Sequence, residues 1–146
     1  MFIGHYAVAL AAKKVVPKVS LGTTLCAASL LDFIWPGLLL AGVEHFRVAP
    51  GVTKVTPLDF YDYPFSHSLV FVLGWSVLFG GAHFALKRER RTAFVLGAVV
   101  FSHWLCDLVV HRPDLPVLPH GPYLGLGVWN SVGGTLLIEG IMFLAG

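Results

Sequence analysis

Three ionisable residues recur at intervals of four in an apolar stretch of the chain. Residues 101–112 have the sequence FSHWLCDLVVHR, which contains His103, Asp107 and His111. In a helix this spacing stacks the three side chains on one face. Imidazole and carboxylate groups are common ligands of zinc, and of manganese or iron. The pattern suits a divalent-metal site, a surface helix, or a core in which the polar groups satisfy one another.

The composition indicates a protein that lies in a membrane. The chain has 146 residues, of which 56% are hydrophobic and 12% are charged, whereas soluble domains average about 25% charged residues. The net charge of +2 gives no argument for a nucleic-acid partner. Cys26 and Cys106 lie inside apolar stretches and form no CxxC pair. We interpret both cysteines as small buried apolar residues.

Some stretches are long enough to cross a bilayer, which takes about 20 apolar residues. Residues 2–12 are too short and suggest a half-helix or an interfacial helix. We predict an all-α integral membrane protein, a single domain over 1–146, with this short N-terminal helix and four transmembrane helices: 20–43, 67–86, 92–111 and 123–146. Pro36 lies inside the first of them and should kink it.

The positive charges predict an orientation. Lys13, Lys14 and Lys18 form one cluster, and KRERR at 87–91 forms another. Alternating spans place both clusters on one side, which should be the cytoplasmic side of the inner (plasma) membrane. The positive charges follow the first apolar run, unlike those of a signal peptide, so we expect this segment to be retained. The other side receives two connections expected to be irregular, 44–66 and 112–122.

Further ionisable groups fall at depths similar to that of His103. Counting along the helices places several in the outer half of one bundle, from four segments: His5, Asp32, His67, His103 and Asp107. His67 fits least well, because straight-helix counting puts it about three turns above Asp32. The preceding loop or a helix tilt must bring it down. A structural alternative is that these groups pair with one another and with backbone carbonyls, without a metal.

The order and spacing of these motifs resemble the YdjM-like family of inner-membrane metal-dependent hydrolases. The matching segments, within residues 1 to about 112, are Gly4-His5, LLDFIW with Asp32, FSHS with His67, and SHWLCD with His103 and Asp107. Two positions depart from the family pattern. Ile34 stands where the family often has a second acid, and the loop before His67 offers Asp59, Asp62 and Tyr63 where it often has an arginine.

The resemblance implies a metal-dependent hydrolase similar to zinc-dependent phospholipase C enzymes, and hence a phosphate-ester substrate. The ligands would be the five residues that converge in the bundle, with zinc as the first choice and manganese or iron as alternatives. A bound ion lowers the pKa of its water to about 7, and Asp107 or Asp62 would act as general base. Arg112 and Arg47 would hold a phosphate head group. For His111 three roles are considered: a metal ligand, a residue that supports the ligands, or an interface residue.

The sequence is also compatible with other classes of function. His103 and His67 could bind haem or a chlorin in a membrane subunit, and buried acids with a Pro-broken helix also suit a small proton-coupled permease. A structural accessory protein is the last alternative. The expected partners are membrane lipids and a lipid-like or phosphorylated substrate, with an oligomer or larger membrane complex left open. Glu139 has no partner that the sequence identifies.

Overall fold

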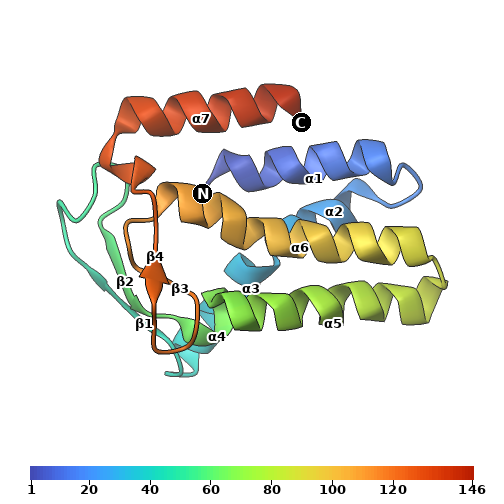
Figure 1. The fold of residues 1–146 in the computed structure, drawn as a ribbon, viewed down its shortest axis with the longest axis horizontal. Coiled ribbons are helices and arrows are strands. Elements are labelled where there is room, and N and C mark those ends of the chain that lie inside the picture. The colour runs from blue at the N-terminus through green and yellow to red at the C-terminus, as the bar shows by residue number, and fades with distance from the viewer.

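The computed structural model describes residues 1–146 and is mostly helical (Figure 1). It contains two small antiparallel hairpins, one 3-10 turn and seven α-helices. The helices are α1 (Ile3–Val15), α2 (Leu21–Ala28), α3 (Leu30–Leu40), α4 (Pro64–His67), α5 (Leu69–Lys87), α6 (Arg90–Val110) and α7 (Val132–Ala145). The remaining elements are β1 (His45–Val48), β2 (Leu58–Asp62), β3 (Leu115–Pro116), β4 (Tyr123–Leu124) and η1 (Val128–Asn130).

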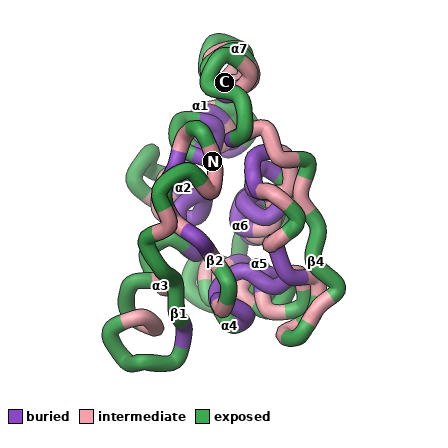
Figure 2. Tube along the Cα trace, turned by 90° about the vertical axis from the view of Figure 1, so that its left-hand side faces the viewer, coloured by how far each residue is buried: buried purple, intermediate pink, exposed green.

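Helix α6 is the centre of the bundle. It packs against α5 on one side and against α1 and α2 on the others, and Figure 2 shows buried backbone concentrated along it. Leu96 and Val100 of α6 are fully buried, in one core with Leu31 of α3 and Val72 of α5. Because α6 is surrounded, polar side chains on its inner faces are removed from solvent and need partners.

Glycine allows α5 and α6 to pack closely. A Cβ atom on Gly80 would lie 2.6 Å from the carbonyl oxygen of Ala93, and one on Gly97 would lie 3.0 Å from that of Ser76. No side chain fits at the first distance without backbone movement. The two longest helices are therefore held in register by backbone contact, as is common between membrane helices.

Two of the predicted spans are confirmed in length and composition. Helices α5 and α6 are long and apolar enough to cross a membrane, and they match 67–86 and 92–111. The segment 20–43 forms a pair, α2 and α3, bent by 55°. The bend lies at Ser29, where the helix is interrupted, whereas Pro36 lies inside α3. This pair would be a third span if it crosses as one unit.

The prediction of a fourth span over 123–146 is wrong. Its helical part, α7, has 14 residues, too few to cross. The residues before it fold back on the end of α6, where the N–H of Leu126 donates to the carbonyl of Leu108 and that of Gly127 to the carbonyl of His111. Gly127 has a φ of 74°, so a continuous α-helix cannot run through this position. Hydropathy alone does not register these breaks.

The connection 44–66 is more regular than predicted. It contains the β1–β2 hairpin, with His45 opposite Asp62 and Arg47 opposite Asp59, followed by the one-turn helix α4. Both hairpins lie at the end of the bundle where α6 finishes (Figure 1). The two basic clusters meet at the opposite end, where Arg91 Nη2 donates to the carbonyl of Val15 over 3.4 Å. The two clusters therefore lie at the same end of the bundle.

Candidate metal centre

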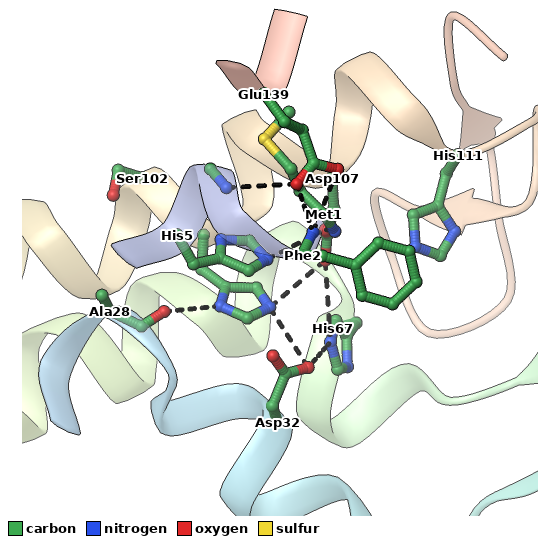
Figure 3. Close-up of polar contacts among 12 residues, drawn as sticks. Met1, Phe2, His5, Ala28, Asp32, His67, Ser102, Asp107, His111 and Glu139 are labelled. Carbon is green, nitrogen blue, oxygen red and sulfur yellow. Dashed lines mark hydrogen bonds and ion pairs between the residues drawn. The ribbon is translucent and has the colours of Figure 1, made fainter. Parts of the chain in front are cut away.

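Five ionisable side chains from four helices meet near the hairpin end of the bundle (Figure 3). His5, His103 and Asp107 each place one ligand atom within 4.8 Å of the others, and so do Asp32, His67 and His103. These are the five residues predicted as metal ligands. The structure therefore brings together all the members of that set, although they span about a hundred residues of sequence.

Helix α6 supplies His103 and Asp107. One turn separates them on its inner face, where they are 1% and 2% exposed. Nε2 of His103 lies 3.2 Å from Oδ2 of Asp107. The helical spacing noted in the sequence thus produces a direct contact between an imidazole and a carboxylate.

Helix α1 brings His5 onto the same group. The His5 ring stacks on that of His103, with centroids 3.7 Å apart and planes 7° from parallel. Its Nε2 atom lies 3.3 Å from Oδ1 of Asp107, the oxygen that also pairs with the terminal ammonium of Met1. Asp107 therefore has one oxygen on the α1 side and the other on the His103 side.

Glu139 of α7 fixes the start of α1. Its buried carboxylate accepts hydrogen bonds from the backbone N–H groups of Phe2 at 3.1 Å, of Gly4 at 3.3 Å, and of Ile3. A carboxylate at this position satisfies the free N–H groups of the first helical turn and interacts favourably with the helix dipole. Glu139 thus holds the turn that carries His5.

Two interruptions of helical structure bring Asp32 and His67 to the cluster. The bend at Ser29 turns α3, so that Oδ1 of Asp32 lies 3.6 Å from Nε2 of His103. The one-turn helix α4 places Nε2 of His67 3.8 Å from Oδ1 of Asp32 and 3.8 Å from Oδ2 of Asp107. Straight-helix counting had separated Asp32 and His67 because it allowed for neither feature.

Backbone contact assigns the proton of His103. Its Nδ1 atom lies 2.7 Å from the carbonyl oxygen of Ala28. Because a carbonyl oxygen only accepts, Nδ1 must carry the proton. In a neutral imidazole Nε2 then presents its lone pair, and Nε2 is buried without a hydrogen-bond partner.

A chain of three side chains makes the same assignment for His67. Oγ of Ser66 donates to Oε2 of Glu44 over 2.7 Å and lies 2.7 Å from Nδ1 of His67. Since the serine proton is used on Glu44, Nδ1 of His67 donates and Nε2 faces the cluster. The backbone N–H of Ser66 also donates to Oε1 of Glu44, over 2.7 Å. Burial raises the pKa of Glu44, while its hydrogen bonds to Ser66 lower it.

These assignments create a place for a cation. Burial lowers the pKa of His67 well below its usual range, and burial together with His103 lowers that of His5 to about 3, so both rings are neutral at neutral pH. The neutral ring of His67 then directs its Nε2 lone pair at oxygens of Asp32 and Asp107, an arrangement that is repulsive unless a positive charge lies between them. Oδ1 of the buried Asp107 has the Met1 ammonium as its counter-charge, whereas Oδ2 faces the imidazoles of His67 and His103.

The donor spacing fits a tetrahedral ion. Zinc binds nitrogen and oxygen ligands at about 2.1 Å, which gives a tetrahedron with edges of about 3.4 Å. The four histidine–carboxylate separations, from Nε2 of His67 and of His103 to Oδ1 of Asp32 and Oδ2 of Asp107, run from 3.2 to 3.8 Å. Small side-chain movements would bring these atoms into coordination. The donor set of imidazoles and carboxylates suits zinc, manganese or iron.

A chamber of about 280 Å³ opens onto the cluster. Asp32, His67 and Asp107 contribute to its lining, and aromatic residues supply much of the rest. The side chain of Asp32 is 50% exposed, whereas that of Asp107 is 3% exposed. Asp32 is therefore the carboxylate that an entering molecule can reach most readily.

The other predicted site residues lie around the cluster rather than in it. His111 lines the chamber, with Nδ1 2.9 Å from Oδ1 of Asp114. Arg47 donates to Asp59 over 2.6 Å, and Arg112 pairs with the same carboxylate. Neither arginine lines the chamber, and they lie on a separate outer cleft.

Asp62 is also remote from the chamber. It lies in β2, where its carboxylate is 2.8 Å from Nδ1 of His45 on the neighbouring strand. Its side chain is 43% exposed, and it does not line the chamber. The predicted role of Asp62 as general base, like the predicted phosphate contacts of Arg47 and Arg112, stays a prediction.

Three residues that contact the site were not singled out as site residues in the sequence. Glu44 and Ser66 orient His67, and Glu139 holds the start of α1. Glu44 and Ser66 are separated by 22 residues and a hairpin, so no local spacing connects them. The only signal for Glu44 in the sequence is its position at the end of the hydrophobic segment 20–43, where an acidic side chain is usually solvated.

No protein-family model, no curated protein and no solved structure matches this chain. The resemblance to the YdjM-like family therefore stays a prediction.

Proposed function

We propose that this protein is a membrane-embedded, metal-dependent hydrolase. The single observation that carries the proposal is the direction of two imidazole lone pairs. Nε2 of His67 and Nε2 of His103 face carboxylate oxygens, because the Nδ1 atom of each ring is committed to another partner. Metal-binding histidines are typically oriented by such a contact on the other nitrogen.

The proposal gives each residue of the cluster a role. His67, His103 and Asp107 would hold the ion, and catalytic zinc sites of this kind have three protein ligands and a water. His5 supports Asp107 through its second oxygen and is the candidate for a further ligand. Asp32 borders the chamber and acts as general base, a role that its exposure suits better than that of Asp107.

The chemistry follows from these positions. A bound divalent ion makes hydroxide available near neutral pH by lowering the pKa of its water to about 7. Asp32 would receive the proton of the attacking water, since its half-exposed carboxylate lines the chamber. The chamber holds the substrate over the cluster, and its apolar walls exclude bulk water. Zinc is the first choice of ion, with manganese or iron as alternatives.

The membrane setting fits an amphipathic substrate. Helices α5 and α6 are long enough to cross a bilayer, and the two basic clusters lie together at the end opposite the hairpins. We assign that basic end to the cytoplasmic side of the plasma membrane. The cluster then lies toward the outer leaflet, where lipid-like molecules can enter from the bilayer.

The competing functions account for fewer of these features. Haem ligation by His67 and His103 would leave Asp32 and Asp107 without a purpose. A purely structural cluster would place a proton, rather than a metal, between the imidazoles and the carboxylates. A proton-coupled permease would use the same buried acids, and the absence of bound metal would favour it.

Elemental analysis of the full chain, purified in detergent, tests the proposal. The double variant His103→Ala/Asp107→Ala should lose the ion that the parent protein carries at about one equivalent. Ser102→Ala is the matched control, because Ser102 lies next to His103 on α6 and its hydroxyl donates to the carbonyl of Val99. A folded parent protein that contains no metal and takes up none on reloading would exclude the hydrolase.

A further inference from the structure

The chamber above the cluster has aromatic walls. Phe60 of β2 connects them, with its ring centroid 5.5 Å from that of Trp35 and 6.3 Å from that of Trp129. Phe2 continues the wall, 5.7 Å from Trp129. These rings come from four separate parts of the chain, and Leu58 adds an aliphatic surface. Such a lining favours an apolar group of the ligand.

The same walls carry free hydrogen-bond donors. The indole nitrogens of Trp35 and Trp129 are buried without a hydrogen-bond partner, and both residues line the chamber. Trp129 is 5% exposed. An indole N–H can only donate, and burying it unpaired is costly. A ligand with neutral acceptor oxygens would satisfy these donors.

The charges in the chamber disfavour a phosphate. No lysine or arginine side chain lines the chamber. Arg47 and Arg112, the residues predicted to hold a phosphate, pair with Asp59 on another cleft. The Met1 ammonium is paired with Asp107. An anionic substrate would therefore have only the bound ion, and no basic side chain, to balance its charge beside Asp32 and Asp107.

We propose that the chamber binds a neutral ester or amide with a short apolar acyl group. This inference rests on the proposed hydrolase function and replaces the phosphate ester implied by the resemblance. The acyl chain packs between Phe60, Trp35 and Leu58, and the carbonyl oxygen lies over the cluster. The volume of about 280 Å³ is at the small end of ligand sites, which suits a short chain rather than a whole lipid tail.

The reaction balances without a further reactant. The oxygen of water bonds to the carbonyl carbon, and Asp32 takes one water proton. The bond from that carbon to the ester oxygen or amide nitrogen breaks. The leaving group takes the proton from Asp32, so the products are a carboxylic acid and an alcohol or amine.

Binding of short neutral amides to the metal-free full chain tests the chamber without catalysis. The probes are butyramide and hexanamide, with butylphosphonate and hexylphosphonate as matched anions, measured by calorimetry in detergent. Burial of two further methylene groups should raise affinity roughly tenfold from butyramide to hexanamide. Each amide should bind more tightly than the phosphonate of equal chain length.

Two variants locate the effect in the chamber. Phe60→Ala should reduce the gain from the longer chain to about threefold or less, and Leu58→Asn, which keeps the side-chain size, should reduce it as well. Phe94→Ala is the control, because Phe94 is 79% exposed on the outer face of α6. If Phe60→Ala does not fold, Leu58→Asn still reports on the chamber.

The outcomes separate this inference from the function on which it rests. Affinity that does not depend on chain length, or tighter binding of the phosphonates, overturns the inference even if the protein holds zinc. Chain-length dependence that Leu58→Asn reduces and Phe94→Ala leaves intact supports it. If that dependence appears in a protein that cannot bind metal, the inference about the ligand of the chamber is supported and the proposed hydrolase function is excluded.

Discussion

Nε2 of His103 lies 3.2 Å from Oδ2 of Asp107, while Nδ1 of the same ring donates to the carbonyl of Ala28. The imidazole therefore offers a lone pair to a carboxylate, which is stable only if a proton or a metal ion lies between them. His67 repeats the arrangement through Ser66 and Glu44.

Glu44→Gln should weaken metal binding by about 10- to 100-fold, the usual effect of removing the support of a metal-binding histidine. The physical reason is that the amide can donate to Oγ of Ser66, which frees the serine proton to turn toward His67 and disturbs its tautomer. Zinc affinity measured by competition with a chelator checks this. Asp62→Asn is the control, since Asp62 is an exposed carboxylate paired with His45. Equal affinities in Glu44→Gln and the parent protein would contradict the proposed role of Glu44.

Asp32→Asn should retain metal and lose hydrolysis by about 10²- to 10⁴-fold, the range for removal of a general base. The amide has the shape of the carboxylate but cannot take a proton from water. Metal content and turnover are measured on the same preparation, with a short-chain acyl ester as substrate. Loss of the metal in this variant would show instead that Asp32 is a ligand.

Glu139→Gln should lower the free energy of unfolding by about 1–3 kcal/mol, because the buried N–H groups at the start of α1 lose part of their acceptor. The N–H groups of Phe2, Ile3 and Gly4 all donate to Oε2, and that of Phe2 also donates to Oε1 at 3.2 Å, where the NH2 group of the amide cannot accept. Thermal unfolding in detergent measures the loss. Leu137→Ala, at an exposed position of the same helix, should change stability little. A variant as stable as the parent protein would mean that solvent or lipid satisfies α1 equally well.

Gly80→Ala should destabilise the α5–α6 pair by about 1–3 kcal/mol, the usual cost of overpacking. Its Cβ atom would lie 2.6 Å from the carbonyl oxygen of Ala93, so the helices must separate. Gly74→Ala on the same helix is the control, since its Cβ atom would meet nothing within 4 Å. Midpoints of thermal unfolding compare the two, and equal values would show that α5 and α6 can adjust without cost.

The sequence by itself determined the local features of this protein. The four-residue spacing put His103 and Asp107 on one face because helical periodicity is local. The apolar runs over 67–86 and 92–111 predicted α5 and α6, since hydropathy and length suffice for long regular helices. Approximate depth along those helices also identified the five residues that meet, including His5 from a helix correctly judged too short to span.

The tertiary structure decided how those residues meet. The bend at Ser29 and the one-turn helix α4 bring Asp32 and His67 together, and neither feature has a strong local signal. The fourth predicted span ends as the short helix α7, because Leu126 and Gly127 hydrogen-bond to the end of α6. The partners of His67 and α1, Glu44 and Glu139, come from distant segments. Contacts between such segments depend on packing, which residue spacing along one chain does not encode.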